Sequence, residues 1–146
     1  MRVLLGLGTS HPRGRAVLQQ AAAALARLER IQLVALSPAV KSPAWGNGTL
    51  FPFTNAAAAV TAGCPLQVVW QSLQALEQRF GRLRVWPNGP RTLDIDVLWC
   101  DASPSVIPEL TVPHPRLSRR PWALLPAMEA ARQAGWVLPW GWHYKI

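Results

Sequence analysis

The sequence predicts an α+β fold in which helices pack on an antiparallel β-sheet. Residues 92–97 alternate strictly between polar and apolar side chains, which is the period of a strand with one buried face. Residues 15–28 are rich in alanine and repeat apolar side chains every three to four positions, as an amphipathic helix does. The chain has 146 residues, half of them hydrophobic, which is enough to bury one core. We therefore expect a single domain that spans residues 1–146.

The remaining elements follow from apolar runs and from the residues that separate them. The predicted strands cover residues 2–7, 32–40, 51–62 and 93–100, and the predicted helices cover residues 15–28, 66–80 and 121–134. Gly8 ends the first strand, and Ser10 is a candidate cap for the first helix. Gly63 closes the third strand, and Pro65 opens the second helix because proline suits the first helical position. Gly89-Pro90 forms the turn before the last strand.

The order of these elements predicts a more specific architecture. Strand, helix, two strands, helix and strand in succession are the ferredoxin-like βαββαβ arrangement, here with a C-terminal helix extension. Residues 106–110 are a candidate hairpin partner for the last strand, and residues 136–138 are predicted to be a short strand or a tail. Such a fold is shared by unrelated activities, so function has to be argued from the site.

The composition narrows the classes of partner. The formal charge is +8, carried by 13 arginines and two lysines that are scattered apart from Arg116, Arg119 and Arg120. A basic chain attracts nucleic acid, anionic membranes or a nucleoside triphosphate, but this one lacks the dense basic stripe of many nucleic-acid readers. No apolar run is long enough to span a bilayer. Cys64 and Cys100 are too few for a disulfide framework or a zinc site, so we expect a reducing, cytoplasmic setting.

Two carboxylates in the last predicted strand are the strongest candidates for chemistry. Asp94 and Asp96 are two residues apart, so both should point away from the core face of Leu93, Ile95 and Val97. Adjacent carboxylates repel unless a cation or strong donors neutralise them. Mg²⁺ commonly takes one or two carboxylates together with phosphate oxygens and waters. An ordinary strand with a solvated polar face has the same pattern.

Arginines near this pair extend the hypothesis toward phosphate chemistry. Arg91 precedes the carboxylates directly, and Arg82 and Arg84 lie just upstream. Guanidinium groups bind phosphate oxygens, and carboxylates hold the metal that phosphoryl transfer requires. The same arginines would also serve as solubilising surface charge.

The segment Gly89-Pro90-Arg91-Thr92-Leu93-Asp94-Ile95-Asp96 resembles the signature of the 6-hydroxymethyl-7,8-dihydropterin pyrophosphokinase family. That signature is Gly-Pro-Arg-x-Leu-Asp-Leu/Ile-Asp, and every fixed position is met. Further segments similar to the family are Gly8-Thr9-Ser10, Lys41-Ser42-Pro43-Ala44-Trp45-Gly46, Phe53-Thr54-Asn55-Ala56, Gln74 with Glu77, Gly81-Arg82-Leu83-Arg84, Val112-Pro113-His114-Pro115-Arg116 and Arg120-Pro121-Trp122. The resemblance thus covers nearly the whole chain.

The resemblance implies 2-amino-4-hydroxy-6-hydroxymethyldihydropteridine diphosphokinase activity in folate biosynthesis. ATP would donate a diphosphate to the hydroxymethyl group of a reduced pterin and leave as AMP. It implies two Mg²⁺ ions on Asp94 and Asp96, with Arg82 and Arg91 as further catalytic residues. The implied ATP-binding residues are Gln74, Glu77, Arg84, His114 and Arg120. Glu77 would hold the ribose or an arginine, or it would simply be solvated. The implied pterin-binding residues are Ser42, Pro43, Trp45, Phe53, Asn55 and Trp122. We expect a monomer that binds neither nucleic acid nor a membrane.

Several positions depart from the family pattern. Asn88 stands where the family usually has a tryptophan, and Trp86 lies two residues earlier. The segment 84–89, which closes over the substrates in the family, is shorter here. Ser10 and Ser42 replace an asparagine and a threonine. Two alternatives therefore stay open: a basic ferredoxin-like module that binds RNA, and a family member that has lost activity and only binds ligand.

Overall fold

The structure is a computed structural model that describes residues 1–42, 52–81, 93–102 and 110–138. Its elements are β1 (Arg2–Thr9), α1 (Gly14–Ala26), β2 (Ile31–Leu36), β3 (Val40–Ser42), β4 (Phe53–Ala62), α2 (Leu66–Gly81), β5 (Asp94–Cys100), the 3₁₀ turn η2 (Leu117–Arg119) and α3 (Pro121–Gln133). The predicted α+β class is confirmed. Except for the predicted strand over 32–40 and for η2, which was not predicted, these elements begin and end within two residues of the predicted bounds.

The five strands form one sheet in which every pairing is antiparallel. Its order is β2-β4-β1-β5, and β3 also pairs with β4. The central strands β1 and β4 are paired from Arg2 and Thr61 at one end to Thr9 and Thr54 at the other. This order makes β5 an edge strand within the part of the chain that the structure describes. The finer ferredoxin-like assignment stays a prediction, as does the single domain over residues 1–146.

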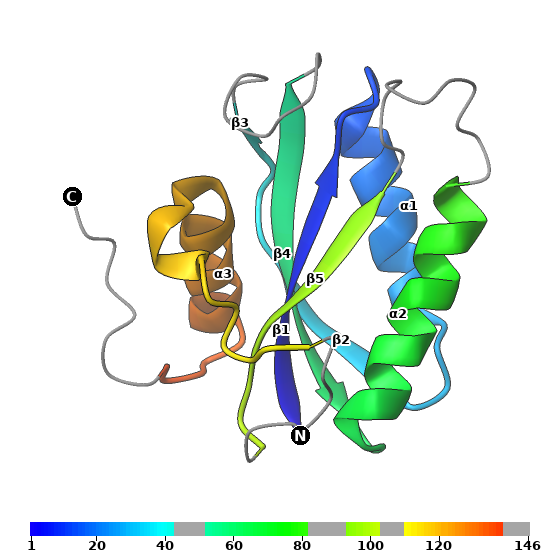
Figure 1. Ribbon diagram of the computed structural model, residues 1–146, viewed down its shortest axis with the longest axis vertical. Coiled ribbons are helices and arrows are strands. Elements are labelled where there is room, and N and C mark those ends of the chain that lie inside the picture. The colour runs from blue at the N-terminus through cyan, green and yellow to red at the C-terminus, as the bar shows by residue number, and fades with distance from the viewer. Residues whose placement is uncertain (43–51, 82–92, 103–109, 139–146) are drawn as a thin grey trace.

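Helices cover both faces of the sheet, so the molecule has three layers (Figure 1). Helices α1 and α2 pack on one face through a cluster that includes Leu5, Leu25 and Leu73. Helix α3 packs on the opposite face through a separate cluster that includes Leu4, Leu98 and Leu124. The arrangement expected for the βαββαβ core places helices on one face, and the C-terminal extension α3 adds a layer on the other.

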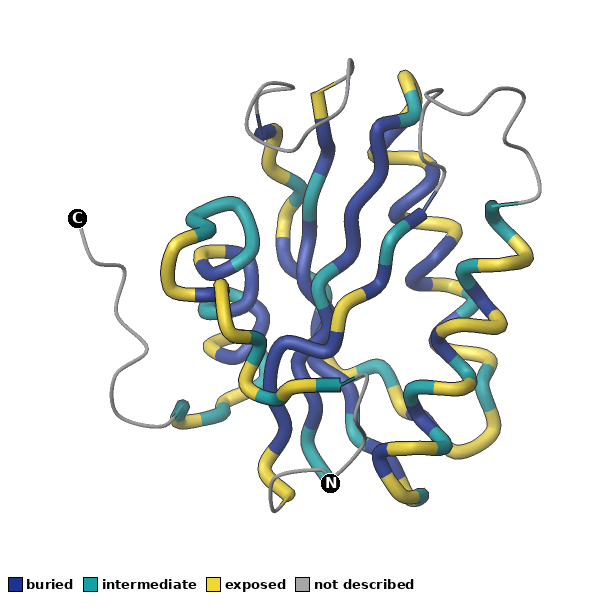
Figure 2. The backbone as a smooth tube through the Cα atoms, viewed as in Figure 1, coloured by how far each residue is buried: buried dark blue, intermediate teal, exposed yellow. Residues whose placement is uncertain are grey.

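Side-chain size and alternation explain why both faces of β4 can be buried. Residues 56–59 are four alanines, and their side chains point alternately to the two helix layers. Small side chains let helices approach the sheet closely on either side. Figure 2 shows the result: the middle of the sheet is buried, whereas the helices alternate between buried and exposed residues.

The predicted strand over 32–40 is wrong in one respect, because the structure divides it into β2 and β3. Pro38 has no N–H group and cannot continue a ladder. At the break, Ser37 donates its backbone N–H to the Ala57 carbonyl, and the Ser37 hydroxyl accepts the Ala57 N–H, both at 2.8 Å. The Ser37 hydroxyl thereby takes the place of a backbone carbonyl as the acceptor of the Ala57 N–H. Pairing with β4 resumes at Val40.

The prediction that Ser10 caps the first helix is also wrong. Helix α1 begins at Gly14 with Arg13 as its N-cap residue and without a side-chain cap. The preceding turn is held instead by two local bonds: Thr9 Oγ1 accepts the His11 N–H at 3.1 Å, and His11 Nδ1 accepts the Arg13 N–H at 3.0 Å.

The last described residues of the chain lie close to its N-terminal strand. The guanidinium of Arg2 lies 5.9 Å from the ring centroid of Trp99 and 5.7 Å from that of Trp136, and its Nε donates to Asp101 at 2.9 Å. Residues 136–138 are a tail without regular structure. The candidate hairpin partner over 106–110 lies outside the described residues except for Leu110. No helix in the described ranges is long and apolar enough to cross a membrane.

Candidate functional site

Six residues on three neighbouring strands make up what we call the site face. They are Gly6 and Gly8 on β1, Phe53 and Asn55 on β4, and Asp94 and Asp96 on β5. In the sheet, Gly8 is paired with Asn55 on one side and with Asp94 on the other, and Gly6 is paired with Asp96. Directly paired residues point to the same face of a sheet. The carboxylates of β5 and the polar end of β4 therefore flank a stretch of β1 that carries no side chains on this face.

The two glycines make room for their neighbours. A Cβ atom on Gly8 would lie 3.3 Å from Oδ1 of Asn55 and 3.3 Å from Cδ1 of Phe53. A Cβ atom on Gly6 would lie 3.3 Å from both Cδ atoms of Leu98. Glycine inside a strand often marks a place where another group approaches the backbone closely. Sequence reasoning identified Gly8 as a strand end and as part of a segment similar to the family, and it missed this role, for which the Gly-x-Gly spacing was a signal.

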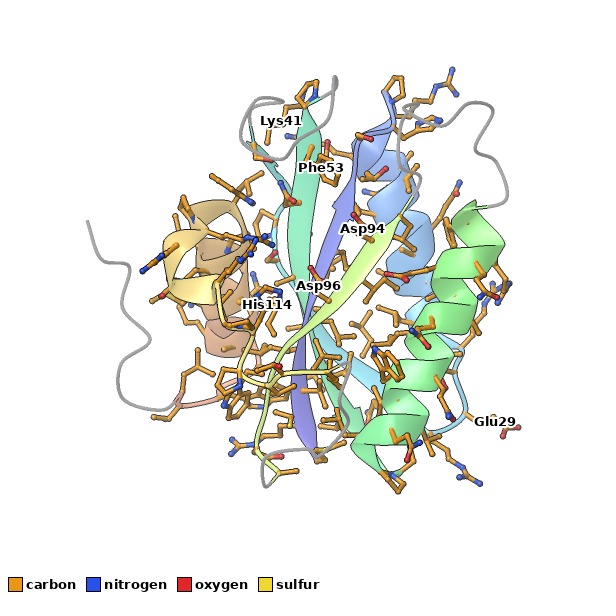
Figure 3. All side chains as sticks on the ribbon, viewed as in Figure 1. Glu29, Lys41, Phe53, Asp94, Asp96 and His114 are labelled. Atoms are coloured by element: carbon orange, nitrogen blue, oxygen red, sulfur yellow. The ribbon has the colours of Figure 1, made fainter. Side chains whose placement is uncertain are left out.

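Asp94 and Asp96 point away from the core, as their spacing predicts. Ile95 and Val97 are buried in the cluster under α1 and α2, while Asp94 is half-buried and Asp96 is exposed on the other side of the strand. Figure 3 labels both carboxylates on β5 and Phe53 on β4, beyond the intervening β1. The described residues contain no group of three His, Cys, Asp or Glu side chains that could hold a metal. Two carboxylates still suit Mg²⁺ when phosphate oxygens and waters complete its shell.

A β-bulge next to Asp96 brings His114 to the site. The pairing of β1 with β5 shifts between Leu4 and Leu5, and this leaves Leu98 without a direct partner on β1. The Leu98 carbonyl accepts the backbone N–H of His114 at 2.9 Å. Bulges occur next to functional sites because they redirect a strand locally. Figure 3 places His114 beside Asp96 on the side of β5 that faces α3.

The charge state of His114 follows from its surroundings. Burial lowers the pKa of its imidazole; the nearby Asp96 carboxylate raises it, the Arg120 and Arg116 guanidiniums lower it, and the net shift is downward. Nδ1 accepts the Arg116 backbone N–H at 3.3 Å, so in the neutral ring the proton is on Nε2. His114 is therefore a neutral group that can donate one hydrogen bond through Nε2.

Ser42 and Asn55 form a contact at the end of β4. The Asn55 amide nitrogen Nδ2 donates to the Ser42 hydroxyl at 3.1 Å. Ser42 is buried and is the residue of β3 that pairs with Phe53. Three of the predicted pterin-binding residues thus lie together: Ser42, Phe53 and Asn55.

The start of α3 carries two more predicted site residues. Arg120 is the N-cap residue, and its carbonyl accepts the N–H groups of Ala123 and Leu124 at 3.0 and 2.8 Å. Trp122 lies in the first turn and is half-buried. The charge of Arg120 is among the influences that lower the pKa of His114. The predicted stacking of a substrate between Phe53 and Trp122 stays a prediction.

The two predicted ATP-binding residues of α2 differ in their surroundings. Gln74 is exposed. Glu77 is half-buried, and its Oε1 accepts the backbone N–H of Ile95 at 2.6 Å. The helix packs on the face of the sheet opposite the site face, so Glu77 reaches the outer edge of β5 rather than the side of Asp94 and Asp96. Sequence reasoning did not foresee this contact.

Some predicted site residues lie outside the described residues. They are Pro43, Trp45, Arg82, Arg84 and Arg91, together with Trp86, Asn88 and Gly89 of the predicted closing segment. Their assignments stay predictions.

Comparison with known proteins gives a family match over most of the chain. The model of the family described as 7,8-dihydro-6-hydroxymethylpterin-pyrophosphokinase (HPPK) matches residues 4–132. The chain is 36% identical over 131 residues to a 2-amino-4-hydroxy-6-hydroxymethyldihydropteridine pyrophosphokinase of Pseudomonas aeruginosa. The aligned residues make up 89% of the chain and 80% of the relative. A protein of the same name from Pseudomonas putida is 37% identical over 115 residues, which covers 78% and 94%. One from Synechocystis is 34% identical over 122 residues, which covers 84% of the chain but 61% of the relative.

Proposed function

The chain belongs to the 7,8-dihydro-6-hydroxymethylpterin-pyrophosphokinase family, and on that premise we propose that it transfers diphosphate from ATP to 6-hydroxymethyl-7,8-dihydropterin in folate biosynthesis, releasing AMP. The observation that carries the proposal is the site face, where Asp94 and Asp96 lie across two glycines from Asn55 and Phe53. One side of this face suits a metal-bound triphosphate and the other a flat heterocycle.

We propose that Asp94 and Asp96 hold two Mg²⁺ ions with the triphosphate. Their parallel orientation on one strand supports this role, because two adjacent carboxylates are stabilised by a cation. Bound Mg²⁺ would neutralise the triphosphate and lower the pKa of the pterin hydroxyl.

Basic residues would bind the phosphates. In the proposal, Arg82 and Arg91 stabilise charge on the group being transferred, and Arg84, His114 and Arg120 hold the remaining phosphate oxygens. The neutral state of His114 supports a donor role, because its Nε2 proton is available to a phosphate oxygen without a change in protonation. Gln74 and Glu77 are further residues that we propose to contribute to ATP binding.

The pterin would lie against the end of β4. Asn55 has an amide that both donates and accepts, which matches the alternating edge of an aminopterin. Phe53 and Trp122 would stack on the two faces of the ring, and Ser42, Pro43 and Trp45 would line the site. The bond between Ser42 and Asn55 supports this role, because it restricts the rotation of the amide.

In the reaction, the pterin hydroxyl oxygen attacks the β-phosphorus of ATP. The bond from that phosphorus to the oxygen bridging to the α-phosphate breaks, AMP leaves, and the hydroxyl proton passes to water. The chain's contribution is to hold both substrates in line and to stabilise the charge on the transferring group.

The test is incubation with ATP, Mg²⁺ and 6-hydroxymethyl-7,8-dihydropterin, followed by quantification of AMP and of the pterin diphosphate. We expect equal amounts of both products, and Asp94→Asn and Asp96→Asn should abolish transfer and weaken Mg²⁺-ATP binding. Glu29→Gln is the matched control, since Figure 3 labels this exposed carboxylate far from the site. Mg²⁺-ATP binding without AMP release would indicate a ligand-binding protein that has lost activity.

We further propose that the protein works as a monomer in the cytoplasm and that residues 1–146 form one domain. Both cysteines, Cys64 and Cys100, are free thiols, which supports a reducing compartment. The alternative of an RNA-binding module receives no support from the family match.

A further inference from the structure

The outer edge of β5 carries a hydrogen bond that the proposed reaction does not use. Within the described part of the sheet, β5 pairs only with β1, so its other edge presents backbone groups without a strand partner. Such groups need partners from elsewhere. The N–H of Ile95 finds one in Oε1 of Glu77, at 2.6 Å. Hydrogen bonds to a carboxylate are shorter and stronger than those between neutral groups.

The reach of Glu77 is set by a firmly packed part of α2. Leu73 and Leu76, on the same stretch of helix, are each 1% exposed in the core beneath the sheet. On the strand, Ile95 and Val97 are 7% and 3% exposed in the same cluster. Helix and strand are therefore fixed relative to each other, and the carboxylate spans a constant gap between them.

This bond acts on the backbone between the two site carboxylates. The nitrogen of Ile95 belongs to the peptide that joins it to Asp94, so the orientation of that peptide sets the direction in which the Asp94 side chain leaves the strand. Asp94 is the first residue of β5, and its pairing with Gly8 is the last between β1 and β5. A strand end is where a ladder frays most readily, so one added bond there has a large effect on geometry.

We infer that Glu77 is a positioning residue for the metal-holding strand, and that it acts on ATP through Asp94 and not by binding the ribose. The inference rests on the proposed function, because it assumes that Asp94 serves a metal-bound triphosphate. Glu77 orients the peptide between Asp94 and Ile95, and that peptide orients the carboxylate. Removal of the Glu77 carboxylate should therefore raise the Mg²⁺ concentration that transfer requires, while leaving pterin binding unchanged.

Three substitutions separate reach from charge. Glu77→Gln keeps an oxygen acceptor at the same distance and should retain most activity. Glu77→Asp keeps the charge but shortens the side chain by one methylene, so it should behave like Glu77→Ala. The last two should lower transfer about tenfold or more and raise the Mg²⁺ concentration for half-maximal activity by a similar factor. Gln78→Ala, next to Glu77 and exposed, is the control. Circular dichroism checks that each variant is folded.

The nucleotide itself tests the ribose alternative. Transfer is measured with ATP, 2′-deoxy-ATP and 3′-deoxy-ATP for the parent protein and for Glu77→Ala. A positioning residue predicts the same fold loss with all three nucleotides. If the loss disappears with one deoxynucleotide, Glu77 binds the missing hydroxyl and the inference is overturned. Equal activity of Glu77→Asp and the parent protein would also overturn it.

Amide hydrogen exchange tests the contact without any reaction. In the unliganded protein, the Ile95 amide should exchange at least several-fold faster in Glu77→Ala and Glu77→Asp than in the parent or in Glu77→Gln. Unchanged exchange in all variants would overturn the inference even if the enzyme is active. Faster exchange in a protein that makes no AMP would support the contact and contradict only the proposed function.

Discussion

Gly8 and Asn55 face each other across β1 and β4, and a Cβ atom on Gly8 would lie 3.3 Å from the Asn55 amide oxygen. The same atom would crowd the Phe53 ring. The position of both groups over β1 therefore depends on the absence of a side chain at Gly8.

Gly8→Ala should displace Asn55 and Phe53 and weaken pterin binding roughly tenfold, with little effect on the affinity for ATP. The reason is that two crowded contacts must shift by a few tenths of an ångström, which costs about 1–3 kcal/mol in a packed environment. Titration of pterin fluorescence with a non-hydrolysable ATP analogue present measures the effect. Gly63→Ala is the control, because no atom of the part of the chain that the structure describes lies within 4 Å of a Cβ there. Unchanged pterin affinity in Gly8→Ala would show that the pterin binds elsewhere.

Ser42 should act on the pterin through Asn55. Ser42→Ala removes the acceptor of the Asn55 Nδ2 hydrogen bond and should cost about 1 kcal/mol of pterin affinity. Ser42→Thr keeps the hydroxyl and should restore binding. The same fluorescence titration compares the two variants, and a loss in both would indicate a packing effect at this buried position instead of a lost hydrogen bond.

Gly14→Ala should destabilise the fold, although alanine is the better helix former. An added Cβ would overlap Thr54 Oγ1 and lie 2.6 Å from Thr54 Cβ, so the start of α1 must move away from β4. We expect a loss of roughly 1–3 kcal/mol in the free energy of unfolding, measured by urea denaturation. Gly81→Ala, at the end of α2, should be neutral or slightly stabilising, because no atom of the described residues lies within 4 Å of a Cβ there. If Gly14→Ala were as stable as Gly81→Ala, the close contact with Thr54 would not exist.

Asp101 should make stability depend on pH in the acidic range. Burial opposes the shift, but the hydrogen bonds and charge of Arg2 lower the pKa of Asp101 below its ordinary value of 3.8. The unfolded chain then takes up a proton first as the pH falls. The contribution of Asp101 is thus present above about pH 4 and is lost as the pH drops through the folded-state pKa.

Both partners are partly exposed, so this contribution should be below about 1 kcal/mol. The measurement is the unfolding free energy of the parent and of Asp101→Asn at about pH 6 and about pH 3. The difference between the two proteins should shrink at the lower pH. A difference that stays constant would mean that the charge of Asp101 does not contribute.

Local periodicity predicted the parts of the site that depend on one element. Alternation in 93–97 was sufficient to place Ile95 in the core and Asp94 and Asp96 on the opposite face, because a strand has a period of two. The break at Pro38 was not predicted, although the residue type was a signal for it, since proline cannot donate to a ladder.

Other features depend on how elements meet and have no local signal. At the bulge, Leu98 is an extra buried apolar residue between other buried apolar residues. The hydrophobic pattern of the sequence is therefore the same whether or not a bulge is present. The bond between Glu77 and Ile95 depends on the packing of α2 against an edge strand 18 residues away in sequence. Likewise, the apolar stripe of α3 fits either face of the sheet, and only the folded chain shows which face it covers.

The separate packing of α3 has a consequence for how the protein opens. The cluster beneath α3 is distinct from the cluster beneath α1 and α2. Loosening of α3 would leave the sheet and its other layer intact, while Arg120 and Trp122, which we propose as ligand-binding residues, would move away from the site face. Opening of the binding site would then cost less free energy than unfolding of the core, so the site would be lost first as conditions become denaturing. Loss of ligand binding would precede loss of secondary structure during heating.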